Sequence, residues 1–321
     1  MREVAFLKQN SEKWESFEQL LKNPKNESAD KIADLYIKVS NDLAYAQSNF
    51  PGSKTASYLN DLAVKAHNTL YSNKRADAGT IARFWKQEIP EIFSRHQKEL
   101  FIAFLIFMVA ISIGVISSVL DDSYVRSFFG DAYMNMTLEN IEKGDPLAVY
   151  KKDSMMNMFF QITINNINVS FTTFIAGMFT AIGSGLLLLQ NGIMVGAFLH
   201  LFAKYALLKE ALLVIFIHGT LELSAIVIAG AAGFVLGNSF LFPGTYSRRT
   251  SFLRGAKESA KMITALVPVF IIAGFLESFV TRHTDMPLLL SLSIIGGSAA
   301  FILYYFVILP NKISNKTSGI L

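Results

Sequence analysis

Residues 211–242, ALLVIFIHGTLELSAIVIAGAAGFVLGNSFLF, form an apolar run that is long enough to cross a lipid bilayer as a helix. The hydrocarbon core of a membrane is about 30 Å thick and needs about 20 apolar residues in helical form. This run also contains His218 and Glu222, and a charged group near the centre of a spanning helix costs at least ~2.5–3.5 kcal/mol. Both side chains are therefore expected to face protein or water rather than lipid.

His218 and Glu222 lie four residues apart, so they share one face of a helix. Small side chains continue this face and would let a neighbouring backbone approach closely; they are Ala225, Ala229, Gly233 and Gly237. The polar pair is thus predicted to point into a helix bundle. Two roles remain open: the pair bonds to neighbouring helices and fixes their packing, or it handles protons, a metal ion or a ligand directly.

The chain is too apolar for an ordinary soluble domain, since 52% of its 321 residues are hydrophobic and 17% are charged. Residues 1–99 nevertheless hold 15 of the 29 basic and 13 of the 25 acidic residues, and no apolar run of spanning length. We therefore expect a cytoplasmic helical domain at 1–99 and a membrane part after it. The chain has no cysteine, which excludes disulfides and thiolate sites, and its net charge of +4 gives no support to a nucleic-acid partner.

Apolar residues at helical spacing predict three helices in this soluble domain. The first carries Trp14, the second carries Ile32, and the third runs from about residue 55 to 71. The next segment, 80–99, has an apolar stripe flanked by basic residues and leads straight into the first apolar run. It is predicted to be an amphipathic helix in the headgroup layer, although a fourth helix packed on the soluble domain would show the same pattern.

Six membrane-spanning helices are predicted in the rest of the chain, so the fold class is an all-α, polytopic membrane protein. Only a short charged stretch separates the third span from the fourth, and residues 211–217 could instead form a re-entrant half-helix. The expected spans cover residues 100–120, 164–189, 192–208, 211–242, 262–280 and 287–309.

Basic residues near the ends of the spans predict the orientation of the chain. Six crossings place the loop 243–261, which has five basic residues, on the same side as the soluble domain and the tail 310–321. The loop 121–163 then lies outside, with seven acidic and four basic residues. Because cytoplasmic loops are enriched in Lys and Arg, both termini are predicted to be cytoplasmic.

This topology places polar groups from three spans in the outer half of the membrane. At about 1.5 Å per residue, the two polar groups of the fourth span lie roughly 10–16 Å below the outer boundary. The fifth span ends with a glutamate, and the second begins with asparagines. We predict an outward-facing polar cavity or a buried hydrogen-bond cluster. Its members are His218, Glu222, Glu277, Asn165, Asn166 and Asn168.

Small residues on the second, third and fourth spans predict close contacts between helices. These expected packing positions are Gly177, Ala181, Gly185, Gly192, Gly196, Gly233 and Gly237.

Three stretches carry a family resemblance. They are NNINVSFTTFIAGMFTAIGSGLLLLQNGIMVGAF at 165–198, HGTLELSAIVIAGAAGFVLG at 218–237 and GDAYMNMTLENIEKGDPLAVYKK at 130–152. Over roughly residues 95–309 the chain resembles the stage II sporulation protein M (SpoIIM) family of integral membrane proteins. The resemblance implies a bacterial membrane protein, since sporulation members act during engulfment as scaffolds beside peptidoglycan-degrading partners. It supplies no catalytic residues.

The expected function is that of a non-enzymatic scaffold or component of an envelope-associated complex in the bacterial inner membrane. Its expected partners are other membrane proteins or a second copy of the chain, as a homodimer. The alternative is a transporter or channel that uses an outward-facing cavity around His218 and Glu222. A metal-dependent intramembrane enzyme is less favoured, because these two side chains alone do not make a metal site. No H-E-x-x-H, G-x-S-x-G or phosphate-binding loop is present, so no cofactor or metal is expected.

The topology leads to a labelling prediction. A cysteine introduced near residue 145 should react with a membrane-impermeant maleimide in intact cells, because that loop is expected outside. A cysteine near residue 250 should react only after the membrane is permeabilised. The cysteine-free chain gives a clean background, and labelling of position 250 in intact cells would show that the orientation is wrong.

Overall fold

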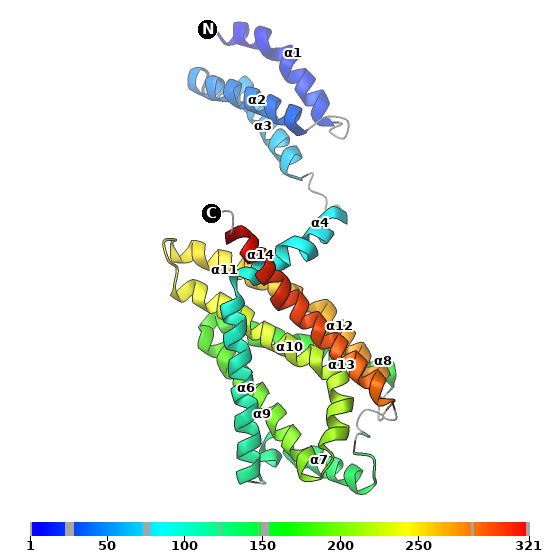
Figure 1. Ribbon diagram of the computed structural model, residues 1–321. Helices are drawn as coiled ribbons and strands as arrows, with labels where there is room; N and C mark the ends of the chain where they lie inside the picture. Colours follow the sequence, from blue (N-terminus) through cyan, green and yellow to red (C-terminus); the bar gives the residue numbers. More distant parts are fainter. Residues whose placement is uncertain are drawn as a thin grey trace. The chain divides into compact units, whose positions relative to one another are not determined.

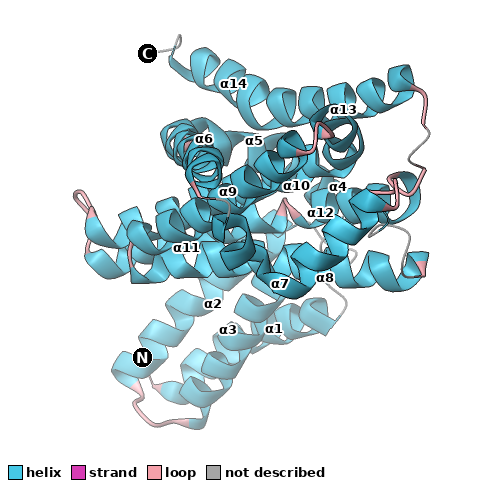
Figure 2. Cartoon of the chain, turned by 90° about the horizontal axis from the view of Figure 1, so that it is seen from below, coloured by secondary structure: helices cyan, strands magenta, loops and turns pink. Residues whose placement is uncertain are grey.

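The computed structural model describes residues 2–22, 29–72, 78–121, 123–146, 148, 154–283 and 286–318. These residues form helices joined by turns, with no strand among them (Figures 1 and 2). The predicted all-α class is thereby confirmed. The chain divides into two compact units, Met1–Ala82 and Arg83–Leu321, and the boundary lies earlier than the expected residue 99.

The first unit contains the three predicted helices: α1 (Glu3–Lys22), α2 (Ala29–Asn49) and α3 (Lys54–Ser72). Its core is built on the aromatic side chains of α1, with Trp14 and Phe17 fully or almost fully buried. The indole of Trp14 donates a 2.8 Å hydrogen bond to Asp42 on α2. Because the indole N–H has this partner, the large ring is buried without the loss of a hydrogen bond.

The segment expected at 80–99 is a helix with a wide turn inside it: α4 (Ala78–Arg83), the π-helical η2 (Phe84–Glu88) and α5 (Ile89–Arg95). The later part of its apolar stripe is buried within the second unit at Ile89, Ile92 and Phe93, and Phe93 packs on Phe306 with ring centroids 4.9 Å apart. Ile81, at the start of the segment, is exposed. Residues 83–95 therefore belong to the membrane unit and are not a fourth helix of the soluble domain.

Five helices are long and apolar enough to cross a membrane. Four of them contain most or all of the expected spans 100–120, 211–242, 262–280 and 287–309. They are α6 (Gln97–Leu120), α10 (Leu208–Leu241), the run Arg248–Val280 and the run Leu288–Ser314; the fifth is α9 (Ala181–Lys204). The protein is a multi-pass helical membrane protein. Since α10 is continuous from its first residue, residues 211–217 do not form a separate half-helix.

The expected spans 164–189 and 192–208 are wrong. The chain forms α8 (Met155–Ile175), then a short 3-10 turn, η4 (Ala176–Phe179), and reverses at Thr180, whose φ is +123°. Ser184, in the first turn of α9, donates a 2.6 Å hydrogen bond back to the carbonyl of Thr173. The run from 164 to 189 contains no proline to mark the reversal, and Gly233 and Gly237 of α10 pack closely against the turn.

The contacts of α8 show its direction relative to the other helices of the membrane unit. Along α8 and α10 residues meet in the same order, with Asn166 beside Glu222 and Gly177 beside Gly233. Other contacts in the membrane unit place α6, α9 and α12 (Val267–Phe275) in one direction and α8, α10 and α13 (Leu288–Leu303) in the other. Three helices thus run in each direction, although α8 is not among the five that are long and apolar enough to cross a membrane.

The two ends of this bundle carry different elements (Figure 1). At one end lies α7 (Ser123–Glu142), which turns at Gly130 and contacts the helices α6 and α9. At the other lie α5, α11 (Arg248–Thr264) and α14 (Leu309–Ser318). Most of the expected outer loop 121–163 is thus helical, although residues 122, 147 and 149–153 lie outside the described part.

Close helix contacts depend on glycine at particular positions. A Cβ at Gly196 of α9 would collide with the backbone carbonyl of Ile111 on α6, and one at Gly177 would collide with the backbone of Gly233. These helices therefore meet backbone to backbone, which gives many dispersion contacts at short range.

We expect Gly196→Ala to destabilise the membrane unit by about 1–3 kcal/mol, because a methyl group there must push the α6 backbone away. The matched control is Gly219→Ala on α10, where a Cβ would lie 3.6 Å from Ile215, an ordinary contact. Thermal unfolding in detergent should show a lower midpoint for the first variant alone. Equal midpoints for the two variants would contradict this account.

Candidate functional site

A cluster of polar side chains joins α8, α10 and the π-helical turn η5 (Leu276–Val280). His218 is 4% exposed, and its Nδ1 lies 3.0 Å from the hydroxyl of Thr281. Its Nε2 lies 3.8 Å from Oε1 of Glu277. Glu222 accepts a 2.5 Å hydrogen bond from the side-chain amide of Asn166. Three separate segments of the chain thus contribute to one buried polar site.

Local helix geometry explains how these groups meet. His218 and Glu222 are one turn apart on α10 and share a face. The wide turn of η5 is closed by the amide of Thr281, which donates a 2.8 Å bond to the carbonyl of Leu276. A π-turn inserts an extra residue and changes the direction in which side chains point, and such turns are frequent at functional sites. The turn here brings both Glu277 and Thr281 to α10.

One ligand atom from each of His218, Glu222 and Glu277 lies within 4.8 Å of the other two. The sequence offered only the first two as a pair, which do not make a metal site. The structure adds a third possible ligand from η5. Two carboxylates at this separation in an apolar interior repel each other strongly unless a proton or metal cation offsets their charge.

Of the three asparagines expected in this layer, only Asn166 reaches the cluster. Asn165 is exposed on the surface of α8, and Asn168 borders a different pocket of about 350 Å³ with Gln190 and Asn191 of α9. Successive residues of a helix point about 100° apart, so neighbours in sequence face different directions. Thr281 was missed because a threonine at the end of an apolar run carries no sequence signal of its own.

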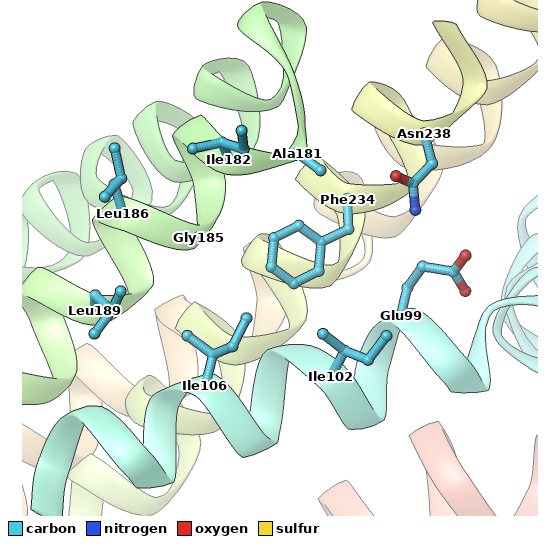
Figure 3. A pocket seen from close by; sticks show the side chains of 10 residues that line it. All are labelled: Glu99, Ile102, Ile106, Ala181, Ile182, Gly185, Leu186, Leu189, Phe234 and Asn238. Atoms are coloured by element: carbon cyan, nitrogen blue, oxygen red, sulfur yellow. The ribbon is translucent and has the colours of Figure 1, made fainter. Parts of the chain in front are cut away.

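The small residues predicted to pack between helices lie mainly where α8, α9 and α10 meet and where α6 meets α9. Gly233 and Gly237 of α10 face the turn between α8 and α9, where Ala181 lies, and Gly192 meets α6 near Phe107. A Cβ added at Gly185 would lie 3.8 Å from the ring of Phe234, which is an ordinary contact. Ala181 and Gly185 also line a groove of about 410 Å³ between α6, α9 and α10 (Figure 3).

Figure 3 shows that the groove is apolar along most of its length. Ile102 and Ile106 of α6 lie opposite Ile182 and Leu186 of α9. Glu99 and Asn238 supply polar atoms at one end only. The groove does not include the polar cluster.

A second charged cluster lies at the end of the bundle that holds α11. His96, between α5 and α6, binds Glu258 of α11 through Nε2 at 2.7 Å, and Arg95 binds the other oxygen of Glu258 at 2.9 Å. Burial favours the neutral imidazole, but the hydrogen bonds to Glu258 and Glu99 outweigh it and raise the pKa of His96 to about 9. The charged imidazole therefore ties the start of α6 to α11.

These features define a class: a multi-pass helical membrane protein that has a buried polar site between its spans and a separate N-terminal helical unit. The family model of stage II sporulation protein M (SpoIIM) matches residues 103–282, more than half of the chain. The chain belongs to this family.

A second family model, a domain of unknown function (DUF8413), matches residues 4–72, the three helices of the first unit. No curated protein and no solved structure matches the chain.

The raised pKa of His96 leads to a prediction about pH. Its contribution to stability, up to about 3 kcal/mol, should be complete below pH 6.5 and be lost as the pH rises through about 9, because only the charged imidazole is favoured in the fold. The difference in thermal midpoint between the wild type and His96→Gln should therefore shrink from pH 6 to pH 9.5. Lys98→Gln, at an exposed neighbour, controls for general effects of pH. An unchanged difference across this range would contradict the assignment.

Proposed function

We propose that this protein is a non-enzymatic scaffold of an envelope-associated complex in the bacterial cytoplasmic membrane. The observation that carries the proposal is that the intramembrane polar groups bond to one another across segments. Asn166 of α8 bonds to Glu222 of α10, and His218 of α10 bonds to Thr281 beyond η5. Such bonds hold spans in a fixed arrangement, as an assembly platform requires.

The orientation of the platform follows from its charges. The helix α11, which follows α10, carries Arg248, Arg249 and Arg254 at the same end of the bundle as α5 and α14. Basic residues near span ends favour the cytoplasmic side. Both termini are therefore assigned to the cytoplasm, and α7 to the outer face.

Little of α13 is buried, with only Ser291 and Ile302 in its interior-facing set. A spanning helix that packs weakly in its own chain offers a surface to other membrane helices. This surface would suit protein partners or a second copy of the chain, as a scaffold needs.

The alternative role, a transporter or channel, is favoured by one observation, the two buried carboxylates near an imidazole, since such groups often mark proton or ion routes. A scaffold predicts no flux through this site. A transporter predicts flux that depends on Glu222.

We expect Asn166→Ala to lower stability by about 1–2 kcal/mol, because Glu222 then loses its bonding partner in the membrane. In native electrophoresis of mildly solubilised membranes, the variant should leave its complex and migrate as the free chain. Asn165→Ala, at the exposed neighbour on α8, should keep the wild-type complex.

A flux measurement on the purified protein in vesicles decides between the scaffold and the transporter. Vesicles that contain the wild-type protein should show no more proton or cation flux than empty vesicles. Flux in the wild type that Glu222→Gln removes would overturn the scaffold proposal and establish the transporter.

A further inference from the structure

We propose that His218, Glu222 and Glu277 bind one divalent transition-metal ion of the zinc class, between α10 and η5. The proposal concerns the chemistry of the buried site and does not depend on the scaffold role. Its starting point is that one ligand atom from each residue lies within 4.8 Å of the others. Zinc–nitrogen and zinc–oxygen bonds are about 2.0–2.2 Å long, so shifts of roughly an ångström or less would bring all three atoms onto one ion.

The hydrogen bonds of His218 point its metal-binding nitrogen into the cluster. The hydroxyl of Thr281 lies 3.1 Å from the carbonyl oxygen of Leu276, which can only accept. The single hydroxyl proton is therefore used there, and the hydroxyl oxygen accepts from Nδ1–H of His218 at 3.0 Å. In the neutral ring this leaves the lone pair on Nε2, which faces Glu277.

The distance between Nε2 and Glu277 suits a shared ion better than a direct bond. The two atoms are 3.8 Å apart, beyond the range of about 2.7–3.2 Å for a hydrogen bond to nitrogen. A lone pair and a carboxylate oxygen that face each other at this distance repel. Two ligands on one ion, each about 2.1 Å from it, lie roughly 3–4 Å apart, so a cation between them turns the repulsion into two bonds.

The charge of the site also matches a divalent cation. Glu222 and Glu277 together carry two negative charges when ionised, and His218 is neutral in the arrangement above. One divalent ion makes the group neutral, which is what a low-dielectric interior requires.

Outer hydrogen bonds hold two of the ligands in place. The hydroxyl of Thr281 accepts a hydrogen bond from Nδ1–H of His218, and the side-chain amide of Asn166 donates one to Oε1 of Glu222. Metal sites in proteins commonly orient a ligating histidine and carboxylate in this way, and loss of such a partner weakens metal binding by about 10–100-fold. One imidazole and two carboxylates suit zinc or manganese rather than calcium, and three protein ligands leave a position for water.

The test uses the full-length chain purified in detergent, exposed to Zn²⁺ and passed through a desalting column. Elemental analysis should find about one zinc per chain, and Zn²⁺ should raise the thermal midpoint. His218→Ala and Glu277→Gln should lose both effects, whereas His200→Ala, at a histidine of α9 outside the group, should keep both.

Two further measurements keep the proposal testable if the ligand variants fold poorly. Thr281→Val removes no ligand but should weaken zinc binding by at least tenfold, and Co²⁺ in the wild type should give visible absorption bands that this variant alters. Zinc that stays with His218→Ala would mark surface binding and overturn the site. Less than a tenth of an equivalent in the wild type, with no shift of the midpoint, would assign the carboxylates to protons instead.

Discussion

A polar side chain inside the hydrocarbon layer must bond to other parts of the protein, because no water is there to bond to it. This requirement explains how the polar helix α8 is held against α10. It is too polar to count among the five apolar spans, yet Asn166 bonds to Glu222 of α10. Since α8 cannot face lipid on that side, its position beside α10 is determined. The chain then reverses at Thr180 and enters α9, one of the five apolar helices.

Small residues allow the helices to pack closely. This close packing is needed because in lipid the hydrophobic effect does not favour contact between helices. Dispersion must replace it, and dispersion needs short distances. Gly196 lets α9 approach the backbone of α6, and Gly233 lets α10 approach the turn after α8. The largest buried set in the membrane unit accordingly lies on α10, which contacts α6, α8, α9 and α11. One face of α10 thus carries the polar pair near one end and the glycines further along, and the two parts make different kinds of contact.

The sequence predicts what depends on local composition. Long apolar runs gave α6, α10 and α13, and helical spacing gave the three helices around Trp14. The reversal at Thr180 was not predictable, because it depends on contacts with α10 from a segment more than 50 residues away in sequence. His218 and Glu222 were identified because a charge in an apolar run is conspicuous. Glu277 could be identified as a member of the cluster, but its direction could not be predicted, because the π-turn that orients it has no sequence signature. Asn166 could not be distinguished from its neighbouring asparagines without knowing which face of α8 meets α10.

The polar cluster connects three segments through different bonds, so its parts cannot be treated as independent. Asn166 ties α8 to Glu222, while Thr281 ties η5 to His218, one turn away on the same helix. These two bonds position Glu222 and His218, and both side chains also lie close to Glu277. Loss of either therefore loosens a contact and also changes the position of a group that must offset charge in the interior. This coupling makes the cluster suitable as a rigid junction and as a cation site at once, because the geometry that fixes the helices also fixes the ligand atoms.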